Sequence, residues 1–197
     1  LVDIADPARP RLLATVSVKG QAYDVALWGE RMAVATWKGG LELFDVSDPA
    51  APRALGRADT KTTSRSVAVL ADGTVVTGSW SAADFEQGDP DYGLEFWDVS
   101  AEQPRRLAEL KTPGWAGDLA VRGTMVYVAD GPGGIRVVDA ANPAAPREVG
   151  NLATEVRAYG IDTGDDGRLV VADNAGGLFI VDVEDPTAPR VLGHLAP

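Results

Sequence analysis

The chain has 197 residues, of which 45% are hydrophobic and 24% are charged, and its formal net charge is −11. It contains no cysteine, which excludes disulfides and thiolate metal sites. The acidic balance disfavours binding to nucleic acid and to anionic membrane surfaces. No run approaches the ~20 apolar residues of a membrane span. Because the first residue is Leu1, we expect a chain that was processed, trimmed or excerpted at its start.

One phrase recurs five times along the chain. Each copy has apolar residues, an aspartate and a turn that ends in Pro-Arg. The copies read LVDIADPARPR at 1–11, LELFDVSDPAAPR at 41–53, LEFWDVSAEQPR at 94–105, IRVVDAANPAAPR at 135–147 and LFIVDVEDPTAPR at 178–190. Their aligned aspartates lie 42, 53, 41 and 43 residues apart. A period near 42 residues is typical of a four-stranded propeller blade, and the long unit carries an insertion.

Turn-forming residues divide each repeat into short segments that are typical of β-strands. Runs of 5–7 residues rich in apolar and β-branched side chains are bounded by Gly, Pro, Asn and Asp, and no stretch has a helical period. Nine of the 13 prolines fall in the repeated turn, where proline belongs because it cannot donate to a central strand ladder. The sequence therefore predicts an all-β propeller of four-stranded antiparallel blades.

The phrase resembles the LVIVD repeat family. The resemblance rests on the apolar-apolar-Asp centre of each phrase, the following D-P-x-x-P or N-P-x-x-P turn, and the strands YVAD at 127–130 and VVAD at 170–173. It covers essentially the whole chain, although the third phrase has AEQP at 101–104 and a turn one residue shorter. The resemblance implies a β-propeller and an extracytoplasmic location, secreted or at a cell surface. It implies little about activity, because propellers host many functions.

The predicted elements form about four and a half blades within a single domain, 1–197. In each blade we name the strands a, innermost, to d, outermost. A partial blade of strands c and d comes first, at 1–18, and full blades follow at 21–59, 64–112, 116–153 and 157–196. We expect further blades, from the same or another chain, to complete a larger closed propeller. A compact five-bladed ring is the alternative.

The entries to the innermost strands are the predicted binding region, because they should surround the central channel. Positions that align there differ in type from blade to blade: Tyr23 and Asp24, Arg65 and Ser66, Gly117 and Asp118, Tyr159 and Gly160. Asp24 and Asp118 would bind a cation or an amine with Arg65 as counter-charge, or the channel would simply be lined by water-bridged polar groups. The repeated aspartates, in contrast, are expected to shape the turn after strand c.

Aromatic residues gather on the same loops, at Trp37, Trp80, Tyr92 and Trp115. Exposed rings there would stack on a sugar or anchor a protein partner. The alternative is packing between neighbouring blades.

The insertion at 81–93 is the one elaboration specific to a single blade, and it is the first choice for a partner-specific contact. Its four acidic residues, Asp84, Glu86, Asp89 and Asp91, are weak candidates for Ca²⁺ ligands. A solvated acidic loop is the alternative, and no other cofactor is expected.

The only histidine, His194, falls on an outermost strand, so a Ser-His-Asp arrangement at the channel is not expected. The first hypothesis is a non-catalytic extracytoplasmic scaffold that binds a protein or a glycan. The second is a metal-dependent hydrolase or lyase that uses Asp24, Asp118, Arg65 and Tyr159 at the channel. The third is a structural segment of a larger surface assembly.

Overall fold

The computed structural model describes residues 1–79, 92–154, 157–164 and 166–196. In these ranges the chain forms strands, turns and bends, and no helix long and apolar enough to cross a bilayer. The strands make four four-stranded sheets and one two-stranded sheet, and all pairings are antiparallel. The all-β fold of four-stranded antiparallel blades is therefore confirmed.

Each four-stranded sheet is one blade whose strands are consecutive in the chain and pair with the next in order. Blade 1 contains β3 (Ala22–Trp28), β4 (Arg31–Thr36), β5 (Gly40–Asp45) and β6 (Arg53–Ala58). Blade 2 contains β7 (Ser64–Val69), β8 (Val75–Ser79), β9 (Gly93–Asp98) and β10 (Arg105–Lys111). Blade 3 contains β11 (Asp118–Arg122), β12 (Met125–Ala129), β13 (Ile135–Asp139) and β14 (Arg147–Leu152). Blade 4 contains β15 (Ala158–Thr163), β16 (Arg168–Asp173), β17 (Gly177–Asp182) and β18 (Arg190–Leu195).

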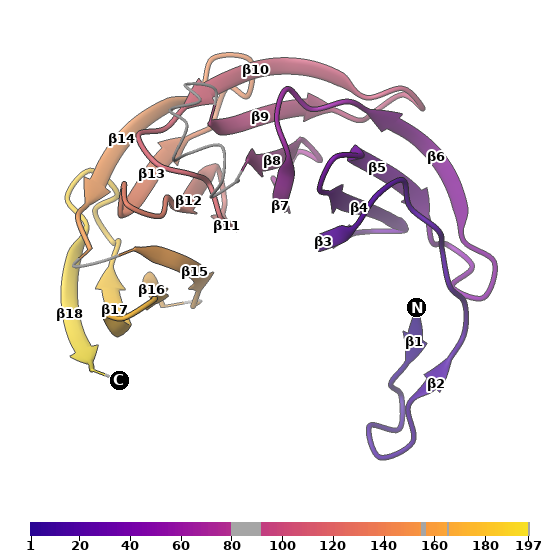
Figure 1. The fold of residues 1–197 in the computed structure, drawn as a ribbon, viewed down its shortest axis with the longest axis horizontal. Helices are drawn as coiled ribbons and strands as arrows, with labels where there is room; N and C mark the ends of the chain where they lie inside the picture. Colours follow the sequence, from indigo (N-terminus) through magenta and orange to yellow (C-terminus); the bar gives the residue numbers. More distant parts are fainter. Residues whose placement is uncertain (80–91, 155–156, 165, 197) are drawn as a thin grey trace.

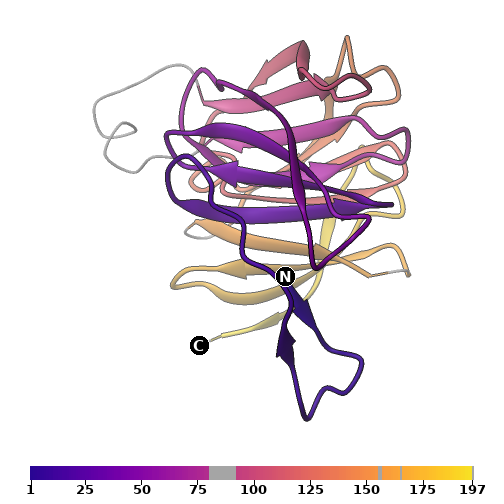
Figure 2. The ribbon, with the colours of Figure 1, turned by 90° about the vertical axis from the view of Figure 1, so that its right-hand side faces the viewer.

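The blades lie side by side around an open arc (Figure 1). The inner strands β3, β7, β11 and β15 contact one another in that order along the inside of the arc. Seen from the side, the blades are successive layers (Figure 2). The half-blade, β1 (Val2–Asp3) and β2 (Arg11–Leu12), lies across the opening from blade 4. The chain therefore does not close on itself into the compact five-bladed ring.

The core lies between blades, because each sheet is apolar on both faces. In β12 of blade 3, Val126 and Val128 pack in the cluster shared with blade 2. The alternate residues Tyr127 and Ala129 pack against Leu169 and the rest of blade 4. This period-2 alternation gives each blade one face toward the preceding blade and one toward the following blade.

The repeated aspartates shape the turn after strand c, as expected. The backbone N–H of Ala141 donates to Asp139 at 2.9 Å, and Arg147 Nη2 donates to its other oxygen at 3.0 Å. The hydrogen bond from Ala141, with that from Arg147, lowers the pKa of Asp139. The same aspartate–arginine pair recurs as Asp3–Arg11, Asp45–Arg53, Asp98–Arg105 and Asp182–Arg190.

Candidate functional site

The predicted channel-mouth residues lie where the innermost strands begin. A β-bulge occurs there in three blades, since pairing skips one residue between Ala22 and Asp24, between Ser64 and Ser66, and between Ala158 and Gly160. The skipped residues are Tyr23, Arg65 and Tyr159. A bulge redirects the side chain of the extra residue out of the ladder. The local backbone thus places these three side chains on the rim instead of in a sheet.

Blades 1 and 2 share a cluster made of Trp37, Tyr23 and Arg65, which we call the rim cluster. The ring centroids of Tyr23 and Trp37 are 5.1 Å apart at an interplanar angle of 33°. The guanidinium carbon of Arg65 lies 4.8 Å from the centroid of the Tyr23 ring, in cation–π range. Tyr23 is nevertheless 40% exposed. The cluster therefore holds the Tyr23 ring in place while leaving part of it exposed.

A second cluster joins blades 3 and 4. Trp115 meets Tyr159 edge-on at 6.1 Å, and the guanidinium carbon of Arg157 lies 5.4 Å from the Trp115 ring. Trp115 itself is 1% exposed, and a Cβ on Gly131, whose φ is +54°, would overlap its indole. Trp115 thus packs between loops, and only Tyr159 and Arg157 remain exposed.

The expectation of exposed aromatic rings needs correction at two positions. Trp115 and Tyr92 are buried, at 1% and 4% exposure, and the Trp115 indole lies against Gly131. Trp37 is partly buried against Tyr23. Trp80 lies outside the described residues, as do Asp84, Glu86, Asp89 and Asp91 of the insertion.

Asp24 and Asp118 link neighbouring blades. One oxygen of Asp24 accepts the N–H of Val25 in its own strand, and the other accepts the N–H of Val67 in blade 2, both at 2.8 Å. Asp118 does the same in blade 3, accepting from Leu119 and from Ile161 of blade 4 at 2.9 Å. The expected cation-binding or acid/base role therefore has to compete with hydrogen bonds that already engage both oxygens of each carboxylate.

Burial raises the pKa of Asp118, although the backbone hydrogen bonds from Ile161 and Leu119 act in the opposite direction. The negative charge of Asp24 adds to the increase, and the positive charge of Arg65 reduces it. The rim charges thus influence one another across the arc. Among the described residues, no group of three or more His, Cys, Asp or Glu side chains is arranged to hold a metal ion.

We predict that Asp118→Ala destabilises the chain by about 1–3 kcal/mol, because the N–H of Ile161 loses its acceptor at the blade 3–blade 4 interface. Asp118→Asn keeps one acceptor oxygen and is expected to lose less. Urea unfolding of the two variants measures the difference. Equal losses for the two variants would show that the carboxylate charge, and not the link to blade 4, stabilises the fold.

His194 has a packing role on β18. Its ring stacks on Phe179 with centroids 4.2 Å apart, and its Nε2 contacts the carbonyl oxygen of Gly176. It lies on β18, the outermost strand of blade 4, which two strands separate from the innermost strand β15.

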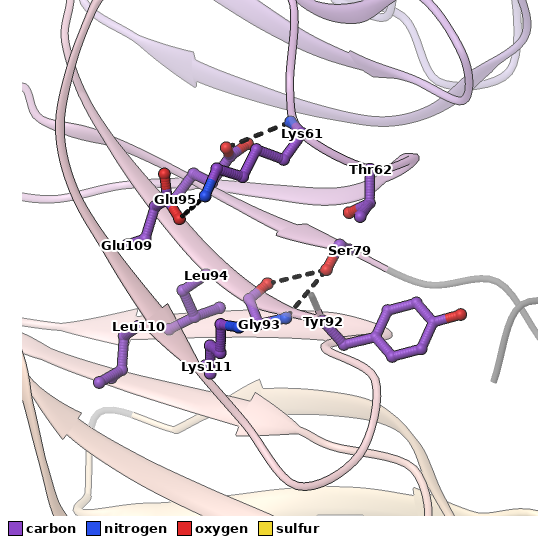
Figure 3. A pocket seen from close by; sticks show the side chains of 10 residues that line it. All are labelled: Lys61, Thr62, Ser79, Tyr92, Gly93, Leu94, Glu95, Glu109, Leu110 and Lys111. Atoms are coloured by element: carbon purple, nitrogen blue, oxygen red, sulfur yellow. Dashed lines mark hydrogen bonds and ion pairs between the residues drawn. The ribbon is translucent and has the colours of Figure 1, made fainter. Parts of the chain in front are cut away.

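A small pocket lies between strands β9 and β10 and the loop before blade 2 (Figure 3). Lys61 Nζ pairs with Glu109 at 2.6 Å, and Arg106 pairs with Glu95 at 2.7 Å. Burial raises the pKa of Glu95 despite this partner. The pocket measures about 20 Å³, which is room for about one water molecule. We therefore interpret it as part of the packing between loop and sheet.

Asp130 is a buried carboxyl group beside the loop that enters blade 3. It follows β12, is fully buried, and accepts the N–H of Gly114 at 2.9 Å. Arg136 Nε lies 3.6 Å from the same carboxylate. Burial raises the pKa of Asp130 to about 6, against hydrogen bonds from Thr112 and Gly114 that lower it. Asp173, at the same position of blade 4, accepts the N–H of Arg157, so this position fixes the loop that enters strand a.

The LVIVD repeat matches residues 19–60, 113–154 and 169–195, more than half of the chain. The chain belongs to the LVIVD repeat family. The matched ranges contain blade 1, blade 3 and the three outer strands of blade 4. Blade 2 lies outside them, and it is the blade with the insertion and the shortened 101–104 turn. No curated protein matches the chain.

Solved structures share the fold of this LVIVD chain. A functionally unknown protein from Desulfotomaculum acetoxidans matches with a TM-score of 0.74 and 12% identity, over 92% of this chain and 58% of that one. A protein from Lactobacillus plantarum matches with a TM-score of 0.70 and 17% identity, over 85% and 53%. The computationally designed Ika8 protein matches with a TM-score of 0.65 and 11% identity, over 87% and 48%. The chain thus spans about half the length of these structures, and the likeness concerns the fold alone.

Arg157 is the rim residue that sequence reasoning missed. It precedes β15 and lies over the Trp115 ring. The aligned positions of the other blades are Gln21, Thr63 and Trp115. The repeat pattern therefore does not predict a positively charged residue at this position. Only the contact between the two loops reveals its place.

Proposed function

We propose that this LVIVD-repeat chain is a non-catalytic scaffold that binds a protein partner at the rim of its inner strands. The rim cluster of Trp37, Tyr23 and Arg65 is the observation that carries the proposal. Tryptophan, tyrosine and arginine are the residues that dominate binding energy at protein interfaces. Because Trp37 and Arg65 already hold the Tyr23 ring, little side-chain entropy remains to be lost when a partner binds.

A protein fits this rim better than a glycan does. Arg65 and Trp37 both lie against the Tyr23 ring, which leaves less of its face for a sugar to stack on. The Tyr23 hydroxyl and the guanidinium of Arg65 supply hydrogen-bond donors next to apolar ring edges. We further propose that this scaffold is extracytoplasmic, at a cell surface or secreted, as the resemblance of its repeats implies.

The test compares baits that differ only at the rim. Wild-type chain, Tyr23→Ala, Arg65→Ala and the control Arg147→Ala are immobilised, and extracellular proteins captured by each are identified. Arg147 is a suitable control because it is an exposed arginine at the start of β14, the outermost strand of blade 3, away from the rim. We expect a partner retained by the wild type and by Arg147→Ala, whose affinity for the two rim variants falls about tenfold or more in calorimetry.

A partner that binds all four baits equally would place the binding surface elsewhere. A glycan array probed with the same four proteins separates the two ligand classes. Rim-dependent binding to glycans without a rim-dependent protein partner would contradict the proposed ligand class.

A further inference from the structure

One face of blade 4 is apolar and exposed although the same positions are buried in blade 3. Val170 and Leu178 are 40% and 37% exposed. Their counterparts Tyr127 and Ile135, at the same register of strands b and c, are 2% and 0% exposed because they pack against blade 4. We call Val170, Ala172, Leu178 and Ile180 the open face. It has the composition of an interface between blades, but no described residue covers it.

Gly193 marks the same surface independently. The outermost strands of blades 1, 3 and 4 carry a glycine at one aligned position: Gly56, Gly150 and Gly193. A Cβ at Gly56 would overlap the carbonyl oxygen of Glu102, and one at Gly150 would overlap that of Pro186. In both cases the carbonyl belongs to the turn after strand c of the following blade. A Cβ at Gly193 would meet nothing within 4 Å.

The other end of the arc is incomplete in a complementary way. Val2 and Ile4 of the half-blade are 52% and 69% exposed, whereas their counterparts Val181 and Val183 are buried against the preceding blade. The opposite side of the half-blade, with Leu1, packs on Phe44 of blade 1. In the described ranges β1 pairs with β2 alone, while every other strand c also pairs with a strand b. No described residue therefore covers the Val2 and Ile4 side of the half-blade or pairs with the inner edge of β1.

We propose that the open face and Gly193 bind a further blade of the LVIVD repeat, one that brings strands a and b with it. Such a blade presents the apolar face and the turn carbonyl that blade 4 itself presents to blade 3, so the contact repeats an interface the molecule already contains. This inference does not depend on the proposed function of the rim.

A second copy of this chain is the less suitable occupant. Each strand pair a–b of the described residues already belongs to a complete blade. A second copy would therefore cover apolar surface but leave the inner edge of β1 unpaired, and exposed strand edges are unfavourable. The similar solved structures, of which the chain covers 48–58%, are longer by an amount that would accommodate further blades.

The experiment uses the absence of cysteine from the chain. Leu178→Cys introduces a single thiol on the open face, and its reaction with a maleimide is timed. The same variant is then extended at its C-terminal end by a copy of residues 113–154. We expect the labelling rate to fall about tenfold or more on extension, because labelling then requires the new blade to detach.

Gly193→Arg provides the decisive variant. It places a side chain where the turn carbonyl of the new blade would lie, so it should restore fast labelling in the extended chain. In the unextended chain the melting temperature should stay unchanged, since no atom lies within 4 Å of the added Cβ. Ile135→Cys, at the matching buried position of blade 3, should label slowly with and without the extension.

Fast labelling of the Leu178→Cys variant in the extended chain and in a second version extended by residues 157–196 would overturn the proposal. Two different extensions guard against failure of one appended blade to fold. Slower labelling of the unextended variant as its own concentration rises would identify a second copy as the occupant, and would also overturn the proposal.

Discussion

Gly150→Ala is expected to destabilise the chain by about 2–3 kcal/mol, while Gly193→Ala is expected to leave its stability unchanged. The two glycines occupy the same position of strand d in neighbouring blades. The carbonyl oxygen of Pro186 fills the space that a Cβ on Gly150 would need, whereas the space at Gly193 is empty. One methyl group is added in both cases, so intrinsic strand propensity cannot explain a difference.

The overlap at Gly150 cannot be relieved cheaply, because the turn that carries Pro186 is held from both sides. Arg190 Nη2 pairs with Asp182 at 2.8 Å, and Asp185 accepts the N–H of Thr187 at 2.9 Å. Moving the carbonyl would strain these hydrogen bonds or separate blade 4 from blade 3. Urea denaturation followed by far-ultraviolet circular dichroism measures both variants. Equal midpoints for the two variants would contradict the close contact between strand d and the next turn.

The features that could be predicted from the sequence are those that each blade repeats. The Asp139–Arg147 pair serves its own turn, eight residues apart, and it recurs in register, so the sequence pattern identifies both the turn and the strands on either side. A continuous apolar run such as that of β12 likewise indicates a strand that is buried on both faces of its sheet. These signals are local, and they survive in blade 2 despite its insertion.

The site is less predictable because its contacts join different blades. The repeat pattern identifies Asp24 as a rim residue, but its bond to the N–H of Val67 spans 43 residues and cannot be deduced from either strand alone. Trp115 lies just before β11 and is buried over Gly131, whereas Trp37 lies just after β4 and is half-buried beside Tyr23. Burial of a loop aromatic depends on the neighbouring blade, which spacing in the sequence does not describe.

The second large effect concerns Asp130 and pH. Its pKa is about 6 in the folded chain, against 3.8 for an unperturbed aspartate. Between these values the folded state holds more protons than the unfolded state, so the free energy of unfolding falls as pH rises. The decrease is complete once pH is about one unit above the folded pKa, and it amounts to about 3 kcal/mol for a shift of this size. Full burial of the side chain means that solvent screens little of this effect.

We therefore expect Asp130→Asn to be similar in stability to the wild type near pH 4 and more stable by about 3 kcal/mol near pH 7. The asparagine oxygen still accepts the N–H of Gly114, so the loop keeps its hydrogen bond. Asp45 and Asp98, whose pKa values are lowered to about 2 by hydrogen bonds from Ser47 and Ser100 and by their arginines, lose their stabilising effect only as pH falls below 4. The raised pKa values of Asp118 and Glu95 are common to both proteins, so the difference between their unfolding curves from pH 4 to pH 7 isolates Asp130. A difference that stays constant over that range would show that the carboxyl group is ionised in the fold throughout, held by Arg136 at 3.6 Å more strongly than burial opposes it.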